Sequence, residues 1–392
     1  MKSFFSKTLI LIALLAVFSC KEKPKNITIA IKNTLDIARS FETVELSKAD
    51  LNIEDLSQIG IKNQKTGELQ ISQLVDQDGD SIFDVLLFQP KIEAHSETIY
   101  EVIDVNHLEI PKSETWCYSR IVPERTDDYT WENNRVAFRV FGPKAQKMVE
   151  DSIPGGTLSS GVDAWLKKVD YPIINKWYKK ELETDGSYHE DTGEGLDNFH
   201  VGVSRGVGGI AVKVDSTYFF SKNFVKWRTI ATGPIRTCFY LEYEDWDAAG
   251  HTIKESKTIS LDFGSNLSKF ETRIEGVNQI AAGLTLHEKD GKVTGNSSKG
   301  WVSYWQPHGD SELGTALVAN KGTFLGFVNY DSEVRDLSNA YAHLKVDNNE
   351  VAYYAGFGWK ESGQFKDQQE WEHYLNTFSE QINNPLVVKI TN

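Results

Sequence analysis

The sequence contains little sulfur, with three cysteines and two methionines in 392 residues. It has no Cys-x-x-Cys pair and no zinc-type spacing of cysteine and histidine, which argues against a cysteine-based metal site. Only Cys117 and Cys238 follow the first twenty residues. Two cysteines do not make a disulfide framework, and isolated buried thiols are the simplest interpretation of them.

Positive charge is scarce as well. The chain has 42 basic and 56 acidic residues, a formal net charge of −14. This balance argues against nucleic acid as a partner, because a polyanion needs a basic surface. It leaves room for a local basic patch that binds a small anionic molecule.

Long apolar runs are absent except at the N-terminus, where Thr8–Phe18 follows Lys2 and Lys7. This run is shorter than the ~20 apolar residues that span a bilayer, and its flanks are typical of an export signal. Cys20 follows it in a context similar to a bacterial lipobox, although Phe18 stands where a small residue is usual. We expect a signal peptide over 1–19 and acyl chains on Cys20, with a short tether over 20–25 leading from the outer membrane. The alternative is an ordinary secretory peptide in which Cys20 is incidental.

Alternating apolar and polar residues dominate the rest of the chain and predict an all-β protein. Two segments are expected to be helical, 163–169 and a C-terminal helix within 366–383. A boundary near residue 115 would divide an N-terminal β module, 26–115, from a larger β-sandwich domain, 116–392. The alternating runs are 26–32, 135–141, 236–243, 257–263, 270–274, 315–319, 323–328 and 351–355.

The segment 187–206 carries the strongest functional signal. It combines two histidines with several carboxylates and glycines, and it has too few large apolar residues to be core. Dense titratable groups on a glycine-rich loop are typical of a catalytic or ligand-binding loop. An acidic surface loop is the alternative. The candidate residues within it are Tyr188, His189, Glu194, Asp197, His200 and Arg205.

A basic cluster lies immediately before this loop. Its lysines, Lys168 among them, alternate with aromatic residues that include Trp177 and Tyr178. Cations beside flat rings suit an anionic sugar, whose ring stacks while its acid group forms ion pairs. A solvated helical face rich in lysine is the alternative interpretation.

Arginines supply candidate clamps for a carboxylate. Arg135 and Arg139 lie four residues apart on an expected strand, so they face the same side. Arg205 is flanked by glycines that let a backbone approach a ligand closely. A structural salt bridge from Arg205 to Glu194 or Asp197 is equally consistent with the sequence. Secondary candidates are Trp305, His287, His308 and His343.

Carboxylates at alternate positions, Asp76, Asp78 and Asp80, with Asp84 four residues further on, resemble the start of a calcium loop. The usual later glutamate is missing and Ser81 replaces the turn glycine, so a tight acidic turn is favoured over a calcium site. Any calcium bound here is expected to be structural.

These segments together resemble a family catalogued as a domain of unknown function in polysaccharide-degrading bacteria. The resemblance rests on 135–143, 163–172, the Gly-Glu-Gly-Leu-Asp core at 193–197, and 201–209. It implies a β-supersandwich similar to that of galactose mutarotases. It also implies a lipoprotein that dehydrates the terminal uronic acid of an oligosaccharide, as in ulvan breakdown.

That chemistry removes the proton on C5 and expels the hydroxyl on C4, which leaves a 4,5-unsaturated uronic acid. On our assignment His189 is the base, Tyr188 or His200 is the acid, and Arg205 and Arg139 stabilise the carboxylate. Glu194 or Asp197 would orient His189, or join it in holding a divalent cation in place of an arginine. The sequence does not require a cofactor. A non-catalytic carbohydrate-binding lipoprotein, and a polysaccharide lyase or sugar epimerase on the same fold, are the alternatives.

Overall fold

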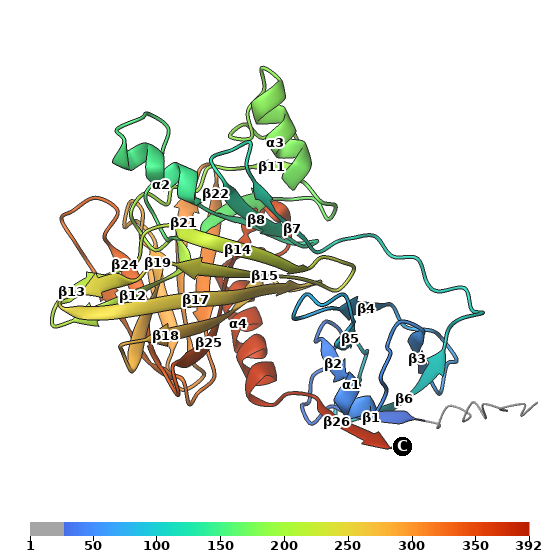
Figure 1. Ribbon diagram of the computed structural model, residues 1–392. Helices are drawn as coiled ribbons and strands as arrows, with labels where there is room; N and C mark the ends of the chain where they lie inside the picture. Colours follow the sequence, from blue (N-terminus) through green and yellow to red (C-terminus); the bar gives the residue numbers. More distant parts are fainter. Residues whose placement is uncertain (1–26, 392) are drawn as a thin grey trace, which may run out of the picture.

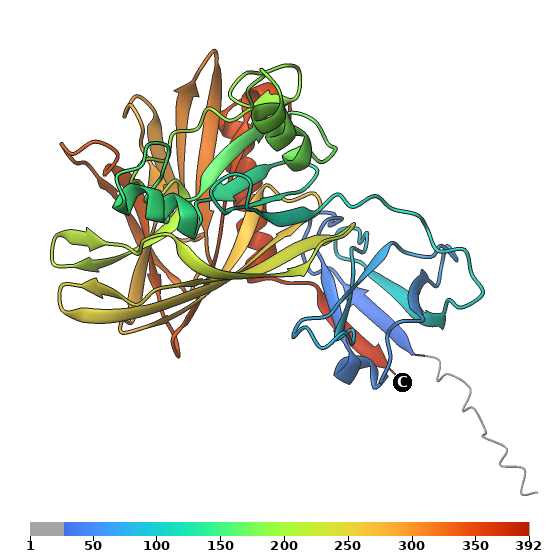
Figure 2. The same ribbon diagram turned by 45° about the horizontal axis from the view of Figure 1, so that its top comes forward.

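The computed structural model describes residues 27–391, so the expected signal peptide, the tether and Cys20 lie outside the described residues. Figures 1 and 2 show a small β module beside a larger β-sandwich, joined by the long segment that follows β6. The prediction of an all-β protein with few helices is confirmed. Within residues 27–391 no helix is both long and apolar enough to cross a bilayer.

The N-terminal module consists of two small antiparallel sheets around a core of its own. One sheet has the strand order β26-β1-β6-β3 and the other β2-β5-β4. The last strand of the chain thus returns to this module and pairs with β1, which a single division near residue 115 does not anticipate. The elements are β1 (Thr28–Lys32), β2 (Val44–Ser47), α1 (Lys48–Leu51), β3 (Ile59–Asn63), β4 (Ser72–Val75), β5 (Val85–Phe88), β6 (Glu97–Asp104) and β26 (Val387–Thr391).

A five-stranded sheet, β11-β10-β9-β8-β7, covers one end of the sandwich and carries two short helices above it. The helix expected at 163–169 is wrong, because Asp163–Lys167 is strand β10. All five of its residues are buried, so the strand shows no alternation for sequence reasoning to find. The elements are β7 (Tyr118–Val122), β8 (Asp128–Glu132), β9 (Ala137–Val140), α2 (Pro143–Glu150), β10 (Asp163–Lys167), α3 (Ile174–Glu183) and β11 (Gly195–Leu196).

The sandwich consists of a five-stranded sheet, β13-β12-β19-β24-β23, packed on a nine-stranded sheet. The large sheet has the order β14-β15-β17-β18-β25-β22-β21-β20, and β16 pairs with β17. Its elements and those of the small sheet are β12 (Val207–Val214), β13 (Thr217–Phe219), β14 (Phe224–Ala231), β15 (Arg236–Tyr243), β16 (Trp246–Ala248), β17 (His251–Asp262), β18 (Leu267–Glu275), β19 (Gln279–Thr285), β20 (Lys292–Asn296), β21 (Trp301–His308), β22 (Ser311–Val318), β23 (Phe324–Tyr330), β24 (Asn339–Lys345) and β25 (Glu350–Trp359).

The main core fills the space between these two sheets and continues under β8, β9 and β10. The expected C-terminal helix is confirmed as α4 (Gln368–Asn383), which follows a single 3-10 turn, η1 (Lys360–Ser362). Asp367 caps α4 by accepting a hydrogen bond from the Glu370 amide. Cys117 and Cys238 are free thiols, as expected.

Candidate functional site

A cavity of about 380 Å³ opens between the β7–β10 sheet and the loop that precedes β12. It brings together Tyr188, His189, Asp197 and His200, all of which the sequence selects as candidates in the segment 187–206. The lining residues are Arg125, Arg139, Phe141, Thr157, Asp163, Tyr188, His189, Asp197, Asn198, Phe199, His200, Val201 and Gly202.

A wider groove of about 760 Å³ runs along α4. It is lined by the exposed face of that helix, including Asp367, Glu370 and His373, and it holds no arginine or lysine. It contains none of the residues that the sequence selects as candidates, so we take the smaller cavity, which we call the pocket, as the candidate site.

Arg139 forms the floor of the pocket. The strand register places it directly opposite Asp163, and its Nε and Nη2 donate to Asp163 Oδ2 at 3.0 and 2.6 Å. Nη2 also donates to Asp197 Oδ2 at 2.9 Å, and Nη1 donates to the Tyr188 hydroxyl at 3.2 Å. The guanidinium is therefore engaged by the protein itself. Arg139 lies in the pocket as predicted, but it organises the site and is not a free clamp for substrate.

Three buried carboxyl groups surround this arginine: Asp128, Asp163 and Asp197. Burial is the main cause that raises the pKa of Asp163 to about 8, with the neighbouring Asp197 adding to the shift against the opposing effect of Arg139. Burial likewise raises the pKa of Asp128 to about 6. Asp163 Oδ1 and Asp128 Oδ2 are buried without a hydrogen-bond partner among the described residues. The three acids and Arg139 thus form a buried network beneath the pocket, in which burial favours the neutral form of Asp163 and of Asp128.

His189 presents one ring nitrogen to the pocket. Its Nδ1 lies 2.5 Å from the backbone carbonyl oxygen of Asp197. A carbonyl only accepts, so Nδ1 carries the hydrogen and the neutral ring keeps its lone pair on Nε2. The side chain is 56% exposed. This tautomer is the one a general base or a metal ligand needs.

His200 also lines the pocket, and residues of neighbouring loops hold it in place. Its Nε2 lies 3.0 Å from Asp336 Oδ2, and its backbone carbonyl accepts from His287 Nε2 at 2.7 Å. Burial and the neighbouring His287 lower the pKa of His308 to about 4, so His308 is neutral and bonds Asn198 Oδ1 at 2.9 Å. His287 and His308 therefore support the pocket loop from behind.

Arg125 and Asp163 are charged pocket residues that the sequence did not reveal. Arg125 lies in the turn between β7 and β8, before Thr126 and Asp127, whose φ angles of 51° and 59° are left-handed. Its Nη1 donates to Thr126 Oγ1 at 3.1 Å, and no ion pair to a carboxylate forms within the described chain. Strained backbone of this kind is often found at functional sites. Burial opposes the charge of Arg125, but the neighbouring Tyr188 and Asp128 outweigh that effect and raise its pKa. Arg125 is thus a pocket cation without an ion pair to a carboxylate among the described residues.

The expectation for Arg205 is not met. Its side chain is fully buried outside the pocket, 3.9 Å from the ring centre of Phe220. Nη1 donates to Ser160 Oγ at 2.9 Å and Nη2 to the Val203 carbonyl at 3.0 Å. Burial lowers its pKa to about 10. Neither the carboxylate clamp nor the alternative salt bridge to Glu194 or Asp197 is formed, because the glycines around Arg205 turn it into the sandwich.

The expected aromatic platforms are core residues. Trp177 and Tyr178 on α3 pack on Trp165, with ring centres 5.4 and 5.0 Å away, in a buried cluster behind Tyr188. Trp305 is buried against α4 in another cluster. His343 lies on β24, where Tyr218 and Gln279 contact it at 3.3 and 2.9 Å. None of these residues lines the pocket.

The lysines of the basic cluster do not line the pocket and form ion pairs within the protein. Lys168 contacts Asp191 at 2.5 Å and Glu361 at 3.0 Å. Glu194 is paired with Lys176 at 2.6 Å and accepts from the Tyr171 hydroxyl. Glu194 therefore does not orient His189, a task that falls to the carbonyl of Asp197.

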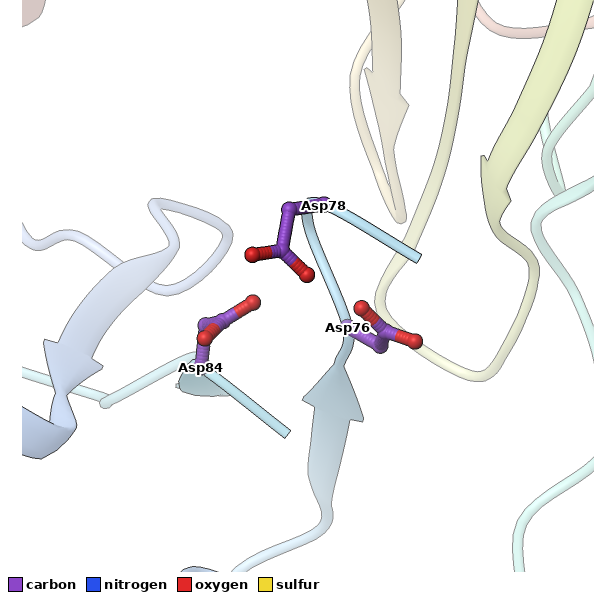
Figure 3. Close-up of side chains that lie close together, drawn as sticks. All are labelled: Asp76, Asp78 and Asp84. Carbon is purple, nitrogen blue, oxygen red and sulfur yellow. The ribbon is translucent and has the colours of Figure 1, made fainter. Parts of the chain in front are cut away.

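The acidic turn of the N-terminal module brings Asp76, Asp78 and Asp84 together, as Figure 3 shows. One oxygen from each lies within 4.8 Å of the others, whereas Asp80 stands outside the group. The amides of Gly79 and Ser81 donate to Asp76, and Lys48 pairs with Asp84 at 3.0 Å. The cluster thus has the hydrogen bonding of a tight acidic turn. Among the described residues no other three side chains are grouped this way, so the pocket offers no such metal-binding set.

A family model described as "Domain of unknown function (DUF4861)" matches residues 31–388. The chain is 54% identical over 377 residues to "Uncharacterized protein P7" from Formosa agariphila, covering 95% of each chain. Among solved structures it is similar to a protein in the glycosyl hydrolase family 38 from Enterococcus faecalis, with a TM-score of 0.51 and 10% identity. That match covers 94% of this chain and 47% of the other, so the chain spans about half the length of that structure. At this identity the likeness shows the fold alone.

Proposed function

Taking as premise that the chain belongs to the DUF4861 family, we propose that it is an oligosaccharide dehydratase whose active site is the pocket. It would remove water from the terminal uronic acid of an ulvan-type fragment to give a 4,5-unsaturated uronic acid. The observation that carries the proposal is one pocket that contains both the Nε2 of His189, which has no partner among the described residues, and the guanidinium of Arg125, which forms no ion pair among them. A sandwich shared with a glycosyl hydrolase family 38 protein supports a carbohydrate substrate.

The pocket has the size and charge for one acidic sugar at the end of a chain. Its volume of about 380 Å³ falls within the roughly 300–1,000 Å³ of small-molecule sites. In our proposal Arg125 binds the substrate carboxylate with its free donors, a geometry in which guanidinium and carboxylate match. This fixes C5, next to the carboxylate, near the rim that carries His189.

His189 Nε2 would then take the proton from C5. The electrons of the broken C5–H bond delocalise toward the carboxylate and then form the C4=C5 double bond as the C4–O bond breaks. The departing hydroxyl takes a proton and leaves as water. Tyr188 is placed for that step, because its oxygen accepts from Arg139 and its own hydrogen is left to donate. Proton transfers of this kind each contribute about 10²–10⁴-fold in rate.

The test uses oligosaccharides with a saturated terminal uronic acid from ulvan, pectin and alginate. We expect absorbance from a conjugated enuronate and a product lighter by one water. His189→Ala should lower kcat by about 10²–10⁴-fold. His251→Ala is the control, because His251 is an exposed histidine on β17, outside the pocket.

Other products would identify the alternatives. Cleavage into two fragments would indicate a lyase, an unchanged mass with altered stereochemistry an epimerase, and binding without turnover a carbohydrate-binding protein. A folded His189→Ala protein with near wild-type turnover would remove His189 from the mechanism. An acyl chain on Cys20 would hold this activity at the outer membrane.

A further inference from the structure

The outer face of the small sheet has no part in the chemistry of the pocket. Its strands, β13, β12, β19, β24 and β23, contain no aspartate or glutamate, although the chain has 56 acidic residues. Ile210 on β12 points into the main core, so Ala211 and Lys213 point to the outer face. The large sheet differs, because its strands carry Glu242 and Glu271, which pair with lysines. The strands of the small sheet thus add no negative charge to this face.

Tyrosines gather on this face. Tyr218 stacks on Tyr341, with ring centres 3.9 Å apart and ring planes 9° apart, and Tyr330 meets Tyr218 edge-on at 5.0 Å. The rings pack with the buried Ala211 and Ala281. Tyr341 is buried as well, whereas Tyr218 and Tyr330 are half-buried. The buried ring therefore holds two partly exposed rings in place, and a ligand that stacks on them meets a surface that is already ordered.

Polar groups surround these rings. Gln279 donates to His343 Nδ1 at 2.9 Å, and burial together with Lys213 lowers the pKa of His343, so this histidine is neutral at pH 7. Its hydrogen is then on Nε2, 3.3 Å from the Tyr218 hydroxyl oxygen, which leaves the hydroxyl hydrogen to donate. Lys213 is exposed and its Nζ lies 5.7 Å from the ring centre of Tyr218. Within residues 27–391 no carboxylate pairs with Lys213, not even Asp215 two residues further on.

We propose that this surface, formed by Lys213, Tyr218, Gln279 and Tyr330 and called the tyrosine face below, binds a stretch of an acidic polysaccharide. A sugar ring would lie on the tyrosines while an acid group of the polymer pairs with Lys213. None of the four residues lines the pocket. The inference therefore goes beyond the proposed dehydratase and does not depend on it. Polymer held here would raise the concentration of chain ends near the enzyme.

A second copy of this chain fits the tyrosine face less well. A two-fold contact would place the face against itself. Lys213 of both copies would then approach each other, and the strands of the small sheet supply no carboxylate to separate them. Lys345, the other lysine of these strands, is already paired with Asp347 at 2.6 Å. An acidic polymer supplies the negative charge that the face lacks, whereas a neutral polymer would leave Lys213 without a partner.

The experiment measures binding of the whole mature chain to ulvan, alginate and neutral dextran by isothermal titration calorimetry. We expect binding to both acidic polymers that weakens with added salt, and much weaker binding to dextran. Tyr218→Ala should lower the affinity for the acidic polymers roughly tenfold, and Tyr218→Phe, which keeps the ring, should retain most of it. Lys213→Glu should lower it about 3–10-fold, since a repulsion replaces an attraction. Circular dichroism checks that each variant is folded.

Lys65→Glu is the matched control, because Lys65 is an exposed lysine of the N-terminal module and the substitution changes the net charge equally. It should bind like the wild type. Equal affinities of Lys213→Glu and the wild type, or an equal loss in Lys65→Glu, would overturn the proposal. An altered oligomeric state of Tyr218→Ala in sedimentation, with unchanged affinity for the polymers, would also overturn it and identify the face as an interface between copies.

Arg125→Gln separates this surface from the pocket. The variant lacks the cation proposed to bind the substrate carboxylate, yet its affinity for the polymers should stay close to that of the wild type. If Arg125→Gln abolishes polymer binding and Lys213→Glu does not, the polymer binds in the pocket and the proposal fails. Polymer binding that depends on Lys213 without any dehydration of oligosaccharides would contradict the proposed function and leave the tyrosine face supported.

Discussion

At the scale of single residues, the candidate arginines differ in what their guanidinium groups bind. Two of them bind other groups of the protein, and Arg125 is the one best placed to bind a ligand. Arg139 and Arg205 donate hydrogen bonds to other groups of the protein, whereas Arg125 donates to Thr126 and forms no ion pair among the described residues. A charge-assisted hydrogen bond contributes roughly 1.5–3 kcal/mol. Arg125 is therefore the residue whose loss should weaken binding of an acidic sugar most directly.

We expect Arg125→Gln to raise KM for a uronate oligosaccharide by about 10–100-fold, the equivalent of that hydrogen-bond energy. Arg125→Lys should recover part of the loss, because lysine restores the charge but not the paired donors. Steady-state kinetics with acidic and neutral oligosaccharides give the comparison. Arg273→Gln is the control, because Arg273 is 63% exposed on β18. Equal KM values for Arg125→Gln and Arg273→Gln would mean that another group binds the carboxylate.

Pocket residues that are close together in the sequence can be predicted more easily than pocket residues that strand pairing brings together. Tyr188, His189, Asp197 and His200 all line the pocket, because one loop carries them. Arg125 and Asp163 were missed, since they reach the pocket from a turn and from a strand paired with β9. The prediction that Trp177, Trp305 and His343 bind the substrate is wrong, because these residues lie outside the pocket. Residue type alone does not distinguish an aromatic ring that stacks on a sugar from one that packs in the core.

At the scale of elements, Gly202 determines the backbone conformation of the loop before β12. Its φ of 52° is left-handed, and a Cβ there would lie 2.1 Å from Asp336 Oδ2 and 2.9 Å from His200 Nε2. A side chain at this position would separate the His200–Asp336 pair. The loop thus requires glycine both for its backbone and for the close approach of two side chains.

Gly202→Ala should reduce the free energy of unfolding by about 1–2 kcal/mol, the cost of a left-handed alanine, and should lower kcat by moving His200. Urea unfolding and turnover measure the two effects. Gly322→Ala is the control, because a Cβ there meets nothing within 4 Å. If both variants behave alike, the geometry of the 198–202 segment has no part in the activity.

The sequence predicts the type of an element that has one exposed face, because its apolar and polar residues alternate. It does not predict the type of a fully buried element. The alternation of β15, with the burial pattern iBiBiBiB, is visible in the sequence. Strand β10 is buried throughout and resembles a short helix, so the element that carries Asp163 was assigned wrongly. For the segment of helix α3, the sequence offers a lysine-rich helical face only as an alternative to a ligand-binding cluster. Its buried residues, Ile174, Trp177 and Tyr178, face the cluster behind the pocket.

At the scale of the whole molecule, the chain closes on itself through β26. This strand pairs with β1 in the register Ile31↔Val388, so the small N-terminal module is complete only when the C-terminus has returned to it. Arg39, buried in that module, also donates to the Asn384 carbonyl at 2.8 Å. Hydrophobic alternation predicts strands but does not say which strands pair, so this closure could not be predicted from local patterns.

The closing strand offers a matched pair of variants. Ile390 packs against the core of the N-terminal module, whereas Val387, on the same strand, is 52% exposed. Ile390→Ala should lower the stability of that module by about 1–3 kcal/mol, less than a fully buried isoleucine because the side chain is only partly covered. Val387→Ala should change it by about 0.5 kcal/mol at most. Amide hydrogen exchange provides the measurement, since β1 should lose protection in Ile390→Ala while β17 and β18 keep theirs. Equal loss of protection in β1 and β17 would instead mean that the module and the sandwich unfold as one unit, and that β26 stabilises both.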